Sequence, residues 1–230
     1  RCMPIPDEFA HRFIYHFTHI DNLPGLVQHG LLANGNPSFP KGVQSIAESG
    51  IQARRAKMAV TCGPKGFVHD YVPFYFGARS LMLLGVIHKK NVDQCDILYF
   101  EFPISLIDND NAVFTDASAN TTEPPNFFSD PSKLHHLNWQ EIDSQKWSCA
   151  TEDLRHQRMA EALVWGGVPL SAASACVVWN KRAREKVEKI SAGVDNFPSI
   201  ARAQKEFWLH SGNAGTSWAR NRQQGPQGDC

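Results

Sequence analysis

The sequence lacks the short patterns that assign many chains to a class at once. It has no G-x-x-x-x-G-K-[ST] phosphate loop and no G-x-G-x-x-G fingerprint, and its six cysteines lie too far apart to form a C-x-x-C pair. A P-loop NTPase, a Rossmann dinucleotide fold and a zinc module are therefore not indicated, and we expect no metal.

Long apolar runs are also missing, and no stretch has the pattern of a secretory leader. A transmembrane helix needs roughly 20 mostly apolar residues, so we expect no membrane segment. The even cysteine count permits disulfides, but a chain of 230 residues with its own core does not need them. We therefore expect a reduced, cytoplasmic protein.

Net charge is the third thing the chain lacks, because 23 lysines and arginines balance 23 aspartates and glutamates. Without a global positive field, any contact with nucleic acid has to be local. Charged residues make up only 20% of the chain and hydrophobic residues 42%, which favours a packed domain over disorder. We predict a single domain over residues 1–210 and a disordered tail over residues 211–230.

Hydrophobic patterning predicts short strands scattered among helices and long loops. Without regular βαβ alternation or an internal repeat, the fold class is α+β. Residues 81–87 fit either a helix turn or a buried strand, and residues 31–50, 117–130 and 147–157 are predicted to be loops or polar connections. Strands are expected at 12–19, 96–102, 112–116, 158–165, 175–179 and 207–209, and helices at 21–30, 51–60, 131–143 and 180–190.

Glu161 is the first candidate for a residue kept for chemistry. It stands at the entrance to an apolar run that ends in Trp165. A charge entering a core costs free energy unless a partner or ligand answers it, although a glutamate at a strand edge commonly points into water. The aromatic window 67–80 contains His69, Tyr71 and Arg79, which suits a pocket wall as well as a core.

Two further segments allow both a functional and a purely structural interpretation. The strand at 12–19 leads directly into a helix N-terminus, which favours an anionic group such as a pyrophosphate but also fits a simple connection. The helical segment 51–60 carries three cations in four residues, and most such runs are solvated faces.

The order of these features resembles that of the ADP-ribosyltransferases, whose nicotinamide site takes one contact group from each of three strands. Tyr15 to Thr18 looks like the first-strand motif of the diphtheria-toxin-like branch, Tyr75-Phe76 like its tyrosine motif, and Glu161 falls where the catalytic glutamate belongs. The match is closer to the DarT family, the DNA ADP-ribosyltransferase toxins of DarTG toxin–antitoxin pairs. It rests on blocks in register between about residues 13 and 179: 19–23, 55–60, 69–76, 113–116, 137–139 and 160–165. Leu81 departs from the family pattern, in which proline is common.

The resemblance implies an ADP-ribosyltransferase-like fold with a split central β-sheet core and helical decorations. The implied activity is mono-ADP-ribosyl transfer from NAD to a nucleobase of single-stranded DNA, with release of nicotinamide. The implied enzyme class is a glycosyltransferase (pentosyltransferase) or a nucleotidyltransferase. A macrodomain-type antitoxin that reverses the modification is the implied partner, and a monomer is expected. Which base is modified, thymine or guanine, stays open.

The resemblance also implies roles for individual residues. Glu161 and Arg55 form the catalytic pair, because a carboxylate near the ribose stabilises an oxocarbenium-like state. Arg55 then binds phosphate or activates the acceptor base, a choice left open, and Arg54 is the weaker candidate. For NAD we expect His16 and Thr18 at the nicotinamide ribose or amide, Asn22 at the phosphates, and Tyr71 and Tyr75 framing the nicotinamide. His19 is either a supporting residue of this site or a core histidine.

For DNA, the resemblance places the recognition loop before Glu161. Aromatic side chains there suit stacking on unpaired bases, and two arginines are close enough in sequence to bind the backbone. These candidates are Trp139 and Trp147, with Phe127 and Phe128, and the arginines Arg155 and Arg158. Two alternatives remain: an ADP-ribosyltransferase acting on RNA, protein or water, and a non-catalytic module that binds NAD or nucleic acid.

Overall fold

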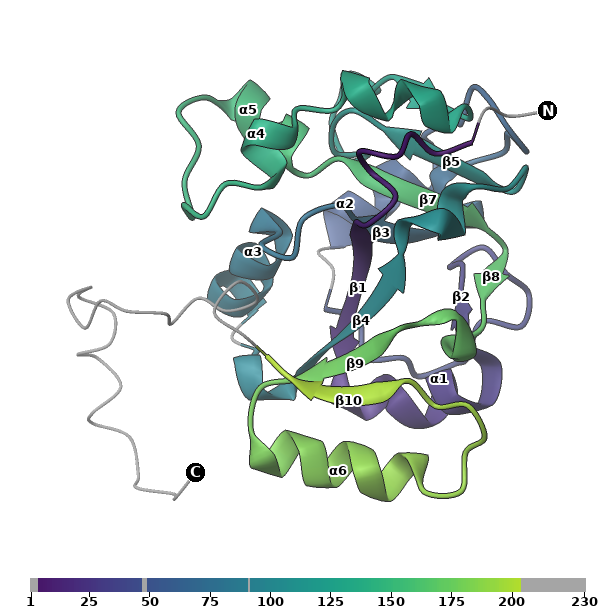
Figure 1. Cartoon of the computed structure of the whole chain (residues 1–230), viewed down its shortest axis with the longest axis vertical. Coiled ribbons are helices and arrows are strands. Elements are labelled where there is room, and N and C mark those ends of the chain that lie inside the picture. The colour runs from purple at the N-terminus through teal and green to yellow at the C-terminus, as the bar shows by residue number, and fades with distance from the viewer. Residues whose placement is uncertain (1–3, 47–48, 91, 204–230) are drawn as a thin grey trace.

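One eight-stranded sheet organises the computed structural model, which describes residues 4–46, 49–90 and 92–203 (Figure 1). Its strand order is β10-β9-β4-β1-β3-β7-β5-β6, and β2 and β8 form a separate pair. The strands are β1 (Phe13–His19), β2 (Leu31–Leu32), β3 (Tyr71–Tyr75), β4 (Ile97–Pro103), β5 (Ala112–Thr115), β6 (Phe127–Phe128), β7 (Glu161–Trp165), β8 (Gly167–Val168), β9 (Ala175–Val178) and β10 (Ser199–Arg202).

Six α-helices and several short 3-10 helices surround the sheet in the described part of the chain. The α-helices are α1 (Leu23–His29), α2 (Ser49–Arg55), α3 (Leu81–Lys90), α4 (Trp139–Ile142), α5 (Glu152–Arg158) and α6 (Lys181–Ser191). The 3-10 helices are η1 (Ile20–Asn22), η2 (Val68–Asp70), η3 (Gln94–Asp96), η4 (Ile104–Ile107), η5 (Pro131–His136) and η6 (Leu170–Ala172).

The centre of the sheet is split, as the resemblance implied. β1 pairs with β4 along its whole length, and β3 pairs with β7 from Tyr71 to Tyr75. Between these two halves, β1 and β3 share only the register pair Tyr15↔Tyr75. The two strands therefore separate beyond this point, and their free ends border the cavity described below.

Alternating side chains of β9 explain how both faces of the sheet are covered. Cys176 and Val178 belong to the main core, which includes Val187 of α6, and the intervening Val177 packs in a second core with Leu83 of α3. Burying apolar side chains on both faces is the main stabilising contribution. Helices α1 and α6 thus cover one face, and α3 covers the other (Figure 1).

Several elements lie where the sequence predicted them. Strands β1, β4, β5, β7 and β9 and helix α1 agree with their predicted ranges, and residues 81–87 form a helix rather than a strand. Helix α6 begins at the predicted cap, because the side chain of Asn180 accepts a hydrogen bond from Ala183 N–H at 2.9 Å. Leu81 is the first residue of α3, a position at which proline is also compatible with a helix.

Other boundaries differ from the prediction. Helix α2 ends at Arg55 instead of residue 60, since the chain becomes extended and Ala59 bridges Phe67. The range 147–157, predicted to be only polar, contains most of α5, whose start is capped by Thr151. The predicted helix at 131–143 is divided into η5 and α4, and strands β2, β3, β6, β8 and β10 were not predicted. The predicted strand at 207–209 and the predicted disordered tail lie outside the described residues.

Within the described ranges, no helix combines the length and the apolar character needed to cross a bilayer.

Candidate active site

A cavity lies between the split strands, α1, α2 and the loop that follows β2. Its wall includes Gly25 and Leu26 of α1, Leu31 and Leu32 of β2, and loop residues from Asn34 to Ile46. Six residues expected from the sequence to belong to the NAD site or the catalytic pair line it together: His16, Thr18, Asn22, Arg55, Tyr71 and Tyr75.

Arg55 links this cavity to Glu161. The guanidinium Nη1 lies 2.8 Å from both carboxylate oxygens of Glu161, and its hydrogen bond goes to Oε1. Both side chains are buried, with 8% of Arg55 and 1% of Glu161 exposed. Breaking such a pair would leave an uncompensated buried charge, so each side chain fixes the other.

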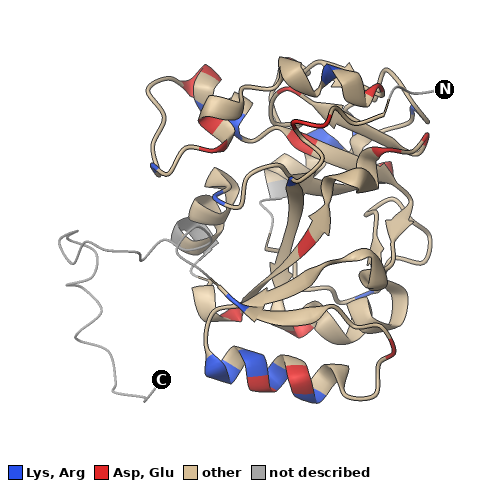
Figure 2. Cartoon of the chain, viewed as in Figure 1, with Lys and Arg blue, Asp and Glu red and all other residues tan. Residues whose placement is uncertain are grey.

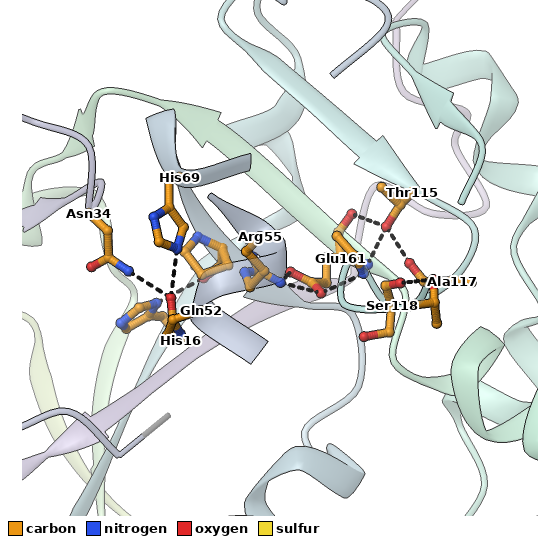
Figure 3. A network of polar contacts seen from close by, with 12 residues as sticks. His16, Asn34, Gln52, Arg55, His69, Thr115, Ala117, Ser118 and Glu161 are labelled. Atoms are coloured by element: carbon orange, nitrogen blue, oxygen red, sulfur yellow. Dashed lines mark hydrogen bonds and ion pairs between the residues drawn. The ribbon is translucent and has the colours of Figure 1, made fainter. Parts of the chain in front are cut away.

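The backbone before β7 holds Glu161 from the other side, and the sequence did not reveal this contact. Ala119 N–H donates to Glu161 Oε1 at 3.0 Å, and Glu161 N–H donates to the hydroxyl of Thr115 at 3.1 Å (Figure 3). Glu161 Oε2 is buried and has no hydrogen-bond partner among the described residues. Oε1 thus accepts from both Arg55 and Ala119 N–H, whereas Oε2 is held only by the ion pair with Arg55 and retains capacity to accept a further hydrogen bond.

His16 is held in one tautomer. Its Nδ1 lies 2.8 Å from the carbonyl oxygen of Pro73, so Nδ1 carries the proton and Nε2 has a free lone pair. Burial lowers the pKa of His16, and the hydrogen bond to Pro73 opposes this shift only partly. A neutral imidazole with a fixed acceptor nitrogen therefore lines the cavity.

Asn22 has a different immediate task from the one expected. Its amide nitrogen donates to the hydroxyl of Thr18 and to Gln44 O, at 3.0 Å each, while its amide oxygen accepts from Gln44 N–H at 2.8 Å. These reciprocal bonds fasten the loop after β2 to the end of β1. Asn22 therefore shapes the cavity wall, and its amide is already engaged rather than free to meet phosphates.

The two tyrosines occupy different parts of the wall. Tyr75 stacks on Phe17 with 5.6 Å between ring centroids, and burial raises its pKa well above the ordinary value. The hydroxyl of Tyr71 donates to Lys65 O at 2.7 Å, and burial raises its pKa to about 12. Both phenols are therefore neutral, and Tyr71 contributes its ring rather than a free hydroxyl.

A second polar network on the same wall was also missed. Gln52 Oε1 of α2 accepts from Asn34 Nδ2 at 3.0 Å and lies 2.8 Å from His69 Nε2 (Figure 3). Desolvation, followed by the nearby charge of Arg55, lowers the pKa of His69. This network ties α2 to the loop after β2 and to the start of β3.

A second cavity adjoins the first and shares Ile46, Ile51, Met82 and Val86 with it. Its polar wall comes from α2, α5 and the loop before β6, and consists of Arg54, Asn120, Glu152, Arg155 and His156. Arg155 lines this second cavity and pairs with Glu152 at 3.2 Å, and its role as a DNA contact stays a prediction.

The structure corrects the expectation for Trp139. Its ring packs against Phe9 and Phe76, the Arg12 guanidinium lies 4.0 Å above it, and its indole N–H donates to Leu134 O. Among the other aromatic candidates, Phe127 packs in the core beneath β5 and Phe128 stacks between Phe114 and His136. Trp139 is therefore a packing residue, since its ring is already covered by protein.

Arg158 was also expected at the DNA backbone and is instead buried, with 2% of its surface exposed. Its Nη2 donates to Ser144 O at 2.8 Å and to Arg79 O at 3.4 Å. Arg12 binds both carboxylate oxygens of Asp143 at 2.8 Å, and Arg79 donates to Gln145 O. Three arginines from distant segments thus hold residues 143–145, which we call the arginine clamp.

Trp147 and His19 complete the set of expected residues. Trp147 is partly buried, and the Arg79 guanidinium lies 5.4 Å from its ring centroid, so it remains a candidate for base stacking. His19 is buried and its Nδ1 accepts from Asp21 N–H at the start of η1, which is a local structural role.

Comparison with known proteins identifies the family. A family model described as ssDNA thymidine ADP-ribosyltransferase, DarT, matches residues 15–210. The chain belongs to the DarT family. A DNA ADP-ribosyl transferase of Thermus sp. (strain 2.9) is 36% identical to it over 194 residues, which cover 82% of this chain and 90% of the relative.

Solved structures extend the DarT comparison to the fold. Thermus sp. 2.9 DarT in complex with ADP-ribosylated ssDNA superimposes with a TM-score of 0.77 at 32% identity, covering 90% of this chain and 100% of that one. The same protein in complex with NAD+ gives a TM-score of 0.71 at 28% identity, covering 89% and 100%. The expected family, fold and enzyme class are confirmed: an NAD-dependent DNA ADP-ribosyltransferase with NAD as co-substrate.

Proposed function

We propose that this DarT family member uses Glu161 and Arg55 to transfer ADP-ribose from NAD to the base of thymidine in single-stranded DNA. The observation that carries the proposal is the buried Arg55–Glu161 ion pair, whose Arg55 lines a cavity together with His16, Thr18 and Tyr75. The family model, whose description names thymidine, supports the choice of base.

Glu161 acts on the ribose of NAD. When the bond to nicotinamide breaks, its electron pair leaves with neutral nicotinamide and positive charge develops on the sugar. We assign to Glu161 Oε2, which is in the ion pair with Arg55 but accepts no hydrogen bond, the contact with a ribose hydroxyl, because a carboxylate fixed by Arg55 and Ala119 N–H stabilises that charge. The bond broken is glycosidic, so the reaction is pentosyl transfer and not nucleotidyl transfer.

Arg55 acts on the acceptor. In thymidine N1 carries the sugar, so N3 is the ring nitrogen that has a proton to lose as it attacks the ribose. A guanidinium that faces the cavity can donate to a carbonyl of the base while it orients the carboxylate. The N3 proton passes to Glu161, the new C–N bond replaces the old one, and the charges balance.

The remaining parts of the proposal concern partners and place of action. An unpaired base presents the edge that carries N3, which a duplex hides, so the acceptor is single-stranded. The DNA contacts we retain are Arg155, which lines the second cavity, and Trp147, whose ring lies near Arg79. By family, we expect a toxin that acts as a monomer in the cytoplasm, countered by a macrodomain-type antitoxin that removes the ADP-ribose.

The deciding experiment is mass spectrometry of oligonucleotides after incubation with the protein and NAD. We expect one added ADP-ribose on a single-stranded oligonucleotide that contains thymidine, and none on its duplex or on a version without thymidine. Glu161→Gln should lower transfer by at least ~10³-fold, whereas Glu185→Gln, on the exposed side of α6, should retain it. The proposal would be contradicted if ADP-ribose were transferred only to RNA or protein, or if NAD were only hydrolysed. Unchanged DNA labelling by Glu161→Gln would also contradict it.

A further inference from the structure

We propose that Arg54 is a positioning residue for the catalytic carboxylate, acting through the loop that precedes β6. It holds the carbonyl of Asn120 and thereby keeps the N–H of Ala119 on Glu161. The inference rests on the role proposed above for Glu161 and adds a residue that never touches NAD or the reacting atoms.

Arg54 and Arg55, the last two residues of α2, both influence the position of Glu161. Arg55 points inward and contacts the carboxylate directly. Arg54 is exposed, and its Nε donates to Asn120 O at 2.9 Å. Because Asn120 follows Ala119, whose N–H donates to Glu161 Oε1 at 3.0 Å, one helix end sets both donors of that oxygen.

The Ala119 contact depends on where the loop lies. Hydrogen bonds weaken steeply as distance and angle depart from the optimum, so a small shift of the loop loses this one. On the side before Ala119, the loop is held by Thr115, whose hydroxyl donates to Ala117 O at 2.7 Å, and by Ser118 N–H, which donates to His156 O at 2.9 Å. Arg54 provides the anchor on the side after Ala119.

The position of Arg54 separates its effect from that of NAD binding. Arg54 lines the second cavity, whereas the neighbouring Arg55 lines the cavity assigned to NAD. Loss of the Arg54 anchor should therefore lower kcat and leave the KM for NAD unchanged. The competing explanation is that Arg54 serves as a cation for the phosphates of the acceptor strand, which would raise the KM for the oligonucleotide instead.

Three substitutions of Arg54 show whether its hydrogen-bond donor or its charge matters. They differ in the atom that takes the position of the arginine Nε. In Arg54→Gln, Nε2 is the same number of bonds from the backbone as the arginine Nε, so the donor stays and the charge goes. In Arg54→Lys that position is a methylene, so the charge stays and the donor moves. Arg54→Met removes both at similar length and is the matched control.

We expect Arg54→Met and Arg54→Lys to lower kcat by about 10- to 100-fold, the effect of losing one hydrogen bond to a charged group. Arg54→Gln should restore kcat to within ~5-fold of the native value. The KM for NAD and the unfolding midpoint should stay as in the native chain. If Arg54→Met fails to fold, comparing Arg54→Gln with Arg54→Lys still shows whether the hydrogen-bond donor or the charge of Arg54 is needed.

The opposite ranking would overturn the inference: full activity in Arg54→Lys, with a raised KM for the oligonucleotide in Arg54→Gln and Arg54→Met. Unchanged kcat in all three variants would overturn it as well. The native chain and Glu161→Gln are measured alongside. Failure of the native chain to modify DNA, or full activity of Glu161→Gln, would count against the proposed function itself, whatever the Arg54 variants do.

Discussion

Tyr75 and Glu161 stand directly opposite each other on the antiparallel strands β3 and β7. Because side chains alternate along a strand, a slip of one residue in this pairing would turn Glu161 to the other face of the sheet. The strand register therefore sets which side the carboxylate faces, and Arg55 and Ala119 N–H then fix its orientation.

Arg55→Lys tests whether the planar guanidinium is needed. The planar guanidinium of Arg55 can donate one N–H to Glu161 and a second N–H to the base. Lysine keeps the charge but lacks this planar arrangement of donors, so kcat should fall by about 100-fold. Arg55→Met should in addition destabilise the fold by about 3 kcal/mol, because Glu161 is left buried without a counter-charge. Steady-state transfer to an oligonucleotide and urea unfolding measure both effects, and native kcat in Arg55→Lys would contradict the assignment.

Stability should fall as the pH drops below about 6.5, where unfolded histidines take up protons. The pKa values of His16 and His69 are lowered in the folded state, so the folded chain binds fewer protons there and the free energy of unfolding decreases. His16→Asn retains a donor for Pro73 O and should flatten this slope by up to ~1.4 kcal/mol per pH unit. Urea unfolding between about pH 7.5 and pH 5.5 gives the slope, and an unchanged slope would be inconsistent with a neutral buried His16.

Trp139 and Trp147 should respond in opposite ways to substitution. Trp139→Leu removes a ring packed against Phe9 and Arg12 and should cost about 3 kcal/mol of stability without changing the KM for the oligonucleotide. Trp147→Leu should raise that KM by roughly 10-fold, the value of one lost base stack, and cost less stability than Trp139→Leu because its ring is only partly buried against the second core. Equal KM values in the two variants would remove Trp147 from the DNA contacts.

Local pattern predicted five strands of the sheet, β1, β4, β5, β7 and β9, but not β3, β6 or β10. The residues that meet at the cavity came from the family resemblance. Period-two hydrophobic runs fix a strand, and a lone charge such as Glu161 at the entrance to one is visible in the sequence. The family resemblance supplied Arg55, which pattern alone left among three cations in four residues.

The errors concern residues whose environment comes from distant parts of the chain. Trp139 has the same local sequence whether its ring stacks on a base or on Phe9. Arg158 gives no sign in the sequence that it will be buried and donate to the carbonyls of Arg79 and Ser144. The Ala119 contact had no signal at all, since every residue except proline carries a backbone N–H.

The distribution of charge argues against a broad basic surface for binding DNA. The densest row of cations lies on α6, where glutamates are interspersed with them and pair with Lys181 and Arg184 (Figure 2). This helix lies across the sheet from α3, and its apolar side packs in the main core. The proposed local contact with DNA therefore rests on Arg155 of the second cavity and not on α6.

The arginine clamp has a mechanical consequence for the chain between it and α5. With Gln145 fixed by Arg79 and Thr151 fixed as the cap of α5, the segment between the two anchors is residues 146–150. At roughly 3.5 Å per residue, this segment spans at most about 20 Å. Its second residue, Trp147, is itself held, because the ring packs against the second core and lies near Arg79. The place at which Trp147 would meet an unpaired base is thus set by the arginines that hold residues 143–145.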